Sequence, residues 1–235
     1  MHPTLRERVD THFYAGMTLL IAAVIVYGFS RTIGDGLLHA SPRPPLILYV
    51  HAAVFSSWVL LLLVQSACVR LSRVRVHRSL GIAGLILGAA MPLLGIATKM
   101  ITTRQAFSGA VPADELSFSA ISLNDMLSFG VVFALGMCWR RRPEYHRRLM
   151  IIASCCLTVA AFARFPGTIV IPPYWYLYVD ALIALGVLRD YLMMGRVHIV
   201  YRVALPALAA GQSLAMYLYL AAPPMWLSAM RWAYS

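Results

Sequence analysis

Long apolar runs, separated by short polar segments rich in arginine, dominate this chain. The run at residues 46–68 is long enough, at about 1.5 Å per residue, to cross a hydrocarbon layer about 30 Å thick as an α-helix. Six further runs lie near residues 13–30, 79–101, 120–138, 149–165, 174–189 and 199–221. The pattern predicts an all-α polytopic membrane protein, a single domain over residues 1–235 folded as a bundle of seven transmembrane helices.

The composition supports this prediction and gives the chain an orientation. Hydrophobic residues make up 60% of the sequence and charged residues only 12%, which excludes an ordinary soluble domain. The net charge of +11 comes from short arginine clusters rather than one continuous basic face, so we expect no nucleic-acid partner. These clusters lie at residues 6–8, 70–78, 140–148 and 189–202. The positive-inside rule then places the amino terminus in the cytoplasm and the carboxyl terminus outside, in the inner membrane of a bacterium.

The second run carries its polar and aromatic residues on one stripe. His51, Phe55, Trp58, Leu62 and Gln65 follow one another at helical spacing. We expect this stripe to face protein rather than lipid.

Ionisable or amide groups occur in the outer third of five predicted helices. They are His51, Lys99, Asn124, Asp125, Arg164 and Asp180. An unpaired charge inside a membrane costs several kcal/mol, so these groups should face inward and pair, with Arg164 and Lys99 bonding to Asp125 and Asp180. Two alternatives stay open: Lys99 and Arg164 lie near helix ends and can snorkel, and His51 and Asp180 can belong to a purely structural network.

These residues suggest a cavity that opens to the outer leaflet and binds a small lipophilic molecule, such as an isoprenoid or a quinone. Asp125 or Asp180 would act as acid or base in a cyclase- or isomerase-like reaction, and His51 would orient the proton. Arg164 and Lys99 would fix the carboxylates or an anionic headgroup, beside a wall that includes Asn124, Trp58, Gln65 and Tyr176. Tyr176 belongs to an aromatic group at residues 174–178, which we expect at the headgroup level.

Four histidines near the cytoplasmic face offer an alternative of a different class. His12, His77, His146 and His198 each lie where the chain re-enters the membrane, the last three in the related segments RVHRSLG, EYHRRLM and RVHIVYR. Imidazoles that converge there could hold a transition metal, and a pair of them could hold haem b. Neighbouring arginines disfavour a dication, and a structural role in capping helices at the interface is the simpler interpretation.

The segments VHAAVFSSW, VQSACVR, VHRSLG, PEYHRRLM, PGTIV and GRVH together resemble a family of uncharacterised bacterial multi-pass membrane proteins. The resemblance covers most of the chain and implies the topology, without an activity. A fainter likeness to b-type haem membrane cytochromes depends on the transmembrane histidines and the arginines at helix starts. A small-molecule transporter and a non-catalytic assembly subunit remain further alternatives. Membrane lipids are expected partners, and a homo-oligomer stays open.

Overall fold

The computed structural model describes residues 5–107 and 109–235, and these residues contain helices and loops but no strand. Helices take up 81% of these described residues. In chain order they are α1 (Leu5–Ser30), the short π-helix η1 (Gly34–Leu38), α2 (Leu46–Arg70), α3 (Val74–Ala106), α4 (Ala113–Cys138), α5 (Pro143–Cys156), α6 (Val159–Phe162), α7 (Trp175–Met194), α8 (Ile199–Ala221) and α9 (Pro224–Tyr234). The predicted all-α class is therefore confirmed.

Five of the helices in the described part of the chain are long and apolar enough to cross a membrane. They are α1 from His12 onward, α2, α3, α4 and α8. The predicted run at 149–165 is divided between α5 and α6, which a turn at residues 157–158 separates. The run at 174–189 forms α7, which carries three charged residues, Asp180, Arg189 and Asp190. The chain is a helical membrane protein with at least these five candidate spans.

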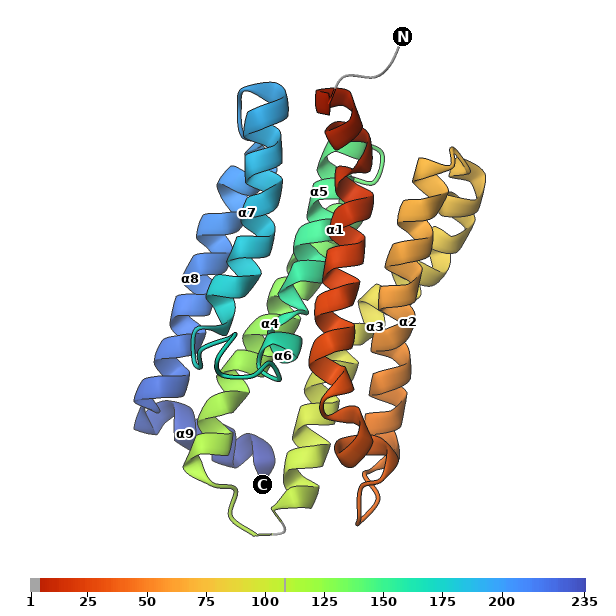
Figure 1. The fold of residues 1–235 in the computed structure, drawn as a ribbon. Coiled ribbons are helices and arrows are strands. Elements are labelled where there is room, and N and C mark those ends of the chain that lie inside the picture. The colour runs from red at the N-terminus through yellow and green to blue at the C-terminus, as the bar shows by residue number, and fades with distance from the viewer. Residues whose placement is uncertain (1–4, 108) are drawn as a thin grey trace.

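The helices lie side by side in one bundle (Figure 1). Helices α2 and α3 form a pair on one side, α7 and α8 lie on the opposite side, and α1, α4 and α5 lie between them. From Leu149 to Cys156, every side chain of α5 except Met150 is buried. A helix that is buried nearly all round is enclosed by protein, so α5 forms the centre of the bundle.

Small residues allow three close approaches between helices. A Cβ atom added at Gly88 of α3 would overlap the Phe133 ring of α4, and one at Gly95 would overlap Met126. Gly28 of α1 lies directly against the backbone of Ala161 in α6. Glycines of α3 and α1 therefore allow close helix packing, as glycine does in other membrane bundles.

A buried group of charges ties α5 to α7 at the end of the bundle where α1 begins. Arg148 donates to both carboxylate oxygens of Asp190, from Nε at 2.9 Å and from Nη2 at 2.7 Å, and both side chains are 0% exposed. Arg189 donates to the same carboxylate at 2.7 Å, and Arg148 also bonds to Glu144 at 2.6 Å. Arg148 and Arg189 belong to the arginine clusters that were predicted to act as topology signals. The structure corrects this, because both arginines are buried parts of a structural network.

Helix α9 lies across the opposite end of the bundle, where the carboxyl terminus is (Figure 1). Arg104, in the last turn of α3, donates to the main-chain carbonyls of Ala233, Tyr234 and Ser235 at 2.8–3.1 Å. The Tyr234 hydroxyl lies 2.9 Å from Ser119 Oγ of α4. A cation at a helix carboxyl end offsets the unpaired carbonyls there, so Arg104 fastens α9 to the bundle.

Candidate functional site

Asn124, Asp125 and Tyr176 form a buried chain of hydrogen bonds between α4 and α7. Asn124 Nδ2 donates to the Tyr176 hydroxyl at 2.9 Å, and that hydroxyl donates to Asp125 Oδ1, also at 2.9 Å. Asp125 is 8% exposed and Tyr176 7% exposed. Tyr176 therefore lies inside the protein, and its expected depth at the headgroup level stays a prediction. Its ring packs in the core while its hydroxyl finds polar partners, as a buried tyrosine requires.

A second carboxyl group lies one helical turn further along α7. Asp180 Oδ1 accepts a hydrogen bond from Gln212 Nε2 of α8 at 2.9 Å. Asn124 Oδ1 lies so close to Gly211 that a Cβ atom there would be 2.8 Å from it, which places α8 directly against Asn124. The five side chains thus come from three adjacent helices, and we call them the polar cluster: Asn124, Asp125, Tyr176, Asp180 and Gln212.

The predicted ion pairs with Arg164 and Lys99 are not formed. Lys99 Nζ, on α3, bonds instead at 2.8 Å to Oε2 of Glu115, which lies in the first turn of α4. Arg164 donates to Thr32 Oγ1 at 3.1 Å and to the Ala160 carbonyl, and its guanidinium lies 4.3 Å from the centre of the Phe29 ring. These two cations bond to groups near their own helix ends.

Both carboxyl groups of the polar cluster consequently have neutral hydrogen-bond donors. Asp125 accepts from a phenol and Asp180 from an amide. In the part of the chain that the structure describes, no Lys or Arg side chain forms a salt bridge with either one. A carboxyl group with neutral partners can exchange a proton without breaking an ion pair, which is the chemistry a general acid or base needs.

The stripe on α2 faces protein, as predicted. Trp58 is 5% exposed, donates from Nε1 to Ser154 Oγ at 3.4 Å and meets the rings of Phe129 and Phe133 edge-on. His51 stacks on Phe55 with the ring centres 4.0 Å apart, and its Nδ1 atom is buried without a hydrogen-bond partner.

Gln65, at the other end of this stripe, also has a buried side-chain oxygen, Oε1, without a hydrogen-bond partner. The hydrogen bonds found for Asp125 and Asp180 do not include His51, Trp58 or Gln65. The sequence pattern predicted one site for all of these residues, but His51, Trp58 and Gln65 share no hydrogen bond with Asp125 or Asp180 among the described residues.

An apolar groove of about 530 Å³ is lined mainly by residues of α4 and α8, together with Tyr145 and Leu149 of α5. Fourteen residues line it: Leu127, Ser128, Val131, Val132, Leu135, Trp139, Tyr145, Leu149, Ile199, Val200, Val203, Ala204, Ala207 and Leu208. Ser128 follows Asn124 by one turn of α4, and Leu208 precedes Gln212 by one turn of α8. The groove and the polar cluster therefore share one helix–helix seam.

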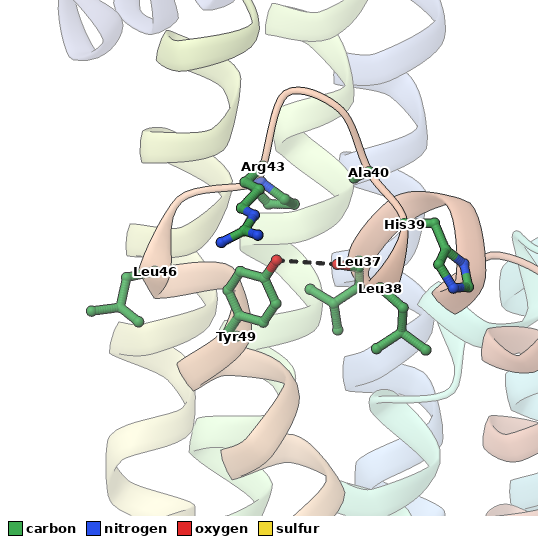
Figure 2. Close-up of a pocket in the computed structure, with 8 residues that line it drawn as sticks. Leu37, Leu38, His39, Ala40, Arg43, Leu46 and Tyr49 are labelled. Atoms are coloured by element: carbon green, nitrogen blue, oxygen red, sulfur yellow. Dashed lines mark hydrogen bonds between the residues drawn. The ribbon is translucent and has the colours of Figure 1, made fainter.

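A second hollow, of about 680 Å³, lies in the connection between α1 and α2 (Figure 2). Its lining includes Arg43, His39, Leu46 and Tyr49, and the Tyr49 hydroxyl donates to the Leu37 carbonyl at 3.1 Å. Most of these side chains are exposed, and none belongs to the predicted site. The hollow is a surface feature of the loop.

The four histidines do not converge on one point. His77 and His146 approach each other, with ring centres 6.4 Å apart. His198 instead packs against Tyr145 and accepts a hydrogen bond at Nδ1 from the Val200 amide. Among the described residues, no three or more His, Cys, Asp or Glu side chains gather as a metal site would require. The predicted alternative of a four-histidine metal ring is therefore corrected to a single histidine pair.

Two features of the site were missed from the sequence. Gln212 is a lone amide in an apolar run, and the groove depends on how α4 and α8 lie against each other. Together the fold and the site define a helical membrane protein with a largely buried polar cluster one helical turn from an apolar groove. No protein-family model, curated protein or solved structure matches this chain. The resemblance to a bacterial membrane family thus stays a prediction.

Proposed function

We propose that this chain is a seven-span protein of a bacterial inner membrane that binds a small lipophilic molecule, of isoprenoid or quinone type, at the seam of α4, α7 and α8. The observation that carries the proposal is the junction of the polar cluster with the apolar groove. Ligand sites combine apolar walls with a few placed polar groups, and this junction supplies both. An apolar tail would lie in the groove and a polar head would lie against the cluster.

The dimensions of the groove favour a chain-like tail. Its lining extends from Leu127 of α4 to Trp139, the residue after the end of α4, a separation of twelve residues or about 18 Å at 1.5 Å per residue. Almost all of the lining side chains are apolar. Ala204 and Ala207 have small side chains, which leave space along the α8 side of the groove. A polyisoprenoid or acyl chain fits such a narrow, elongated shape better than a compact polar solute does.

The polar cluster suits a head that both donates and accepts hydrogen bonds. Asp125 and Asp180 have neutral partners, and a hydroxyl or carbonyl group of the ligand can exchange with Tyr176 or Gln212. Asp125 and Asp180 are also the groups that would act as acid and base if the bound molecule is turned over in a cyclase- or isomerase-like reaction.

Seven crossings account for the path of the chain. The segment at 149–165 and helix α7 run alongside the five long apolar helices, and the start of α1 and the carboxyl terminus lie at opposite ends of the bundle (Figure 1). An odd number of crossings is needed for that arrangement. We place the amino terminus in the cytoplasm, because the arginine clusters at 70–78, 140–148 and 189–202 would then all lie on that side.

Native mass spectrometry of the detergent-purified protein tests the ligand proposal. We expect a co-purified lipophile on the wild-type chain and on the control Asp114→Asn, which changes an exposed acid at the start of α4. The double variant Asp125→Asn/Tyr176→Phe should lose at least about ten-fold in occupancy, equivalent to about 1.4 kcal/mol of binding free energy. Equal occupancy in all three proteins, or no bound lipophile in any, would contradict the proposal.

A further inference from the structure

The hollow in the connection between α1 and α2 lies where the chain leaves one candidate span and enters the next. The span in α1 ends at Ser30 and the span in α2 begins at Leu46, so residues 31–45 lie outside both apolar segments. The end of this connection, together with the first turn of α2, forms the hollow of about 680 Å³ (Figure 2). Lipid headgroups occupy this level of a bilayer, so the hollow is placed to meet them.

Hydrogen bonds give the hollow a fixed shape. The Tyr49 hydroxyl, in the first turn of α2, donates to the Leu37 carbonyl of η1 at 3.1 Å. The His39 amide closes η1 by donating to the Gly34 carbonyl at 2.8 Å. The connection therefore folds back against α2 and leaves a concave surface between them. Its volume lies within the range of about 300–1,000 Å³ that is typical of ligand pockets.

Arg43 gives the hollow a positive charge that no acid neutralises in the described part of the chain. None of the salt bridges found in residues 5–107 and 109–235 includes Arg43. Its guanidinium points into the space between the connection and the Tyr49 side chain (Figure 2). A guanidinium presents a planar fork of N–H donors that matches two oxygens of a phosphate group. The polar part of the lining therefore suits a phosphate.

Leucines supply the apolar part of the lining. Leu38 is 66% exposed and Leu46 is 77% exposed. Leu46 is also the first residue of α2, so an acyl chain that lies against it would continue along the candidate span into the membrane. Covering such apolar surface is favourable by about 25 cal/mol per Å². The order along the chain, with the cation outside and the leucine at the start of the span, matches a phosphate that lies above its acyl chains.

We propose that this hollow binds one anionic phospholipid, such as phosphatidylglycerol, with its phosphodiester on Arg43 and an acyl chain against Leu46. The connection at residues 31–45 contains two arginines and one acid, and an excess of cations at a membrane surface favours anionic headgroups. The hollow shares no lining residue with the groove and contains no member of the polar cluster. The phospholipid site is therefore independent of the proposed lipophile site.

The test uses the purified full-length protein in an uncharged maltoside detergent and a phosphatidylglycerol that carries a diazirine on its acyl chain, close to the glycerol. After irradiation, mass spectrometry of the peptides locates the label, which we expect within residues 37–49 of the wild type. Arg43→Gln should reduce this labelling at least ten-fold and unfold at the same temperature as the wild type, because Arg43 is exposed. Arg231→Gln removes the same charge from an exposed position of α9, at the same end of the bundle, and should be labelled as the wild type is.

Two competitors separate a lipid site from a simple anion site or a simple apolar site. Inorganic phosphate lacks the acyl chains, and diacylglycerol with the same chains lacks the phosphate. Each should compete with the probe at least ten-fold more weakly than unlabelled phosphatidylglycerol does. Three results would overturn the proposal: label that falls only outside residues 37–49, equal labelling of Arg43→Gln and the wild type, and competition by either partial compound as strong as that by phosphatidylglycerol.

Discussion

Replacement of Asp190 by asparagine should destabilise the protein strongly, because it removes the shared partner of two buried arginines. Arg148 and Asp190 are both 0% exposed, and two direct hydrogen bonds join them. Breaking a buried ion pair by removing one partner costs about 3–5 kcal/mol, since the remaining charge stays buried. In a chain of this size each kcal/mol shifts Tm by about 2–4 °C, so we expect a loss of about 6–20 °C.

Thermal unfolding of the detergent-solubilised protein, followed by the fluorescence of its five tryptophans, measures this loss. Asp114→Asn makes the same chemical change at an exposed position and should cost less than about 1 kcal/mol. The double variant Arg148→Met/Asp190→Leu replaces the pair by apolar side chains of similar size. It should recover part of the loss, because apolar replacement of a buried pair is often neutral.

The reasoning is refuted if Asp190→Asn unfolds within about 3 °C of the Asp114→Asn control. That outcome would mean that water or another side chain compensates Arg148 once the carboxylate is gone.

Three further predictions follow from other contacts. Gly28→Ala should lower Tm, with a loss of about 1–3 kcal/mol from overpacking against α6, whereas Gly16→Ala, which has open space, should not. Arg104→Gln should release α9 and speed proteolysis of the carboxyl-terminal segment, leaving the rest of the bundle intact. Burial raises the pKa of Glu144, but hydrogen bonds from Arg148 and Arg147 outweigh it and hold the pKa below its ordinary value. Its contribution to stability is therefore present above about pH 4.3 and is lost as the pH falls further, so Glu144→Gln should flatten the decrease of Tm in acid.

The apolar pattern was sufficient to predict the class of fold and the inward face of α2. Burying a tryptophan is favourable only against protein or lipid, and the helical spacing of Trp58 with Phe55 and Leu62 places all three on one side of the helix. The structure buries Trp58 against Phe129 and Phe133, as that spacing requires. Periodicity is a property of one segment, so the sequence alone can specify it.

The partners of the charged groups could not be predicted in the same way. In the sequence, several acidic residues were candidate partners for Lys99. The pairing with Glu115 depends on how α3 is rotated relative to α4. Arg148 lies in an arginine cluster that also fits an exposed loop, and only the packing of α5 against α7 shows that it is buried. Gln212 has no charge and no motif, so its bond to Asp180 becomes visible only once α7 and α8 are side by side.

The measurement that most directly tests the proposed ligand site is photo-crosslinking with an isoprenoid quinone analogue that carries a diazirine on its tail. After irradiation in lipid nanodiscs, mass spectrometry of the peptides locates the label. The proposed site predicts labels on residues 127–139, in and just after α4, and on residues 199–208 of α8. Unlabelled quinone and Ala204→Phe should reduce this labelling. Ala209→Phe, which changes an exposed residue outside the groove, should not. Labels spread evenly over exposed apolar residues such as Val26, Leu60 and Leu93, without competition, would contradict it.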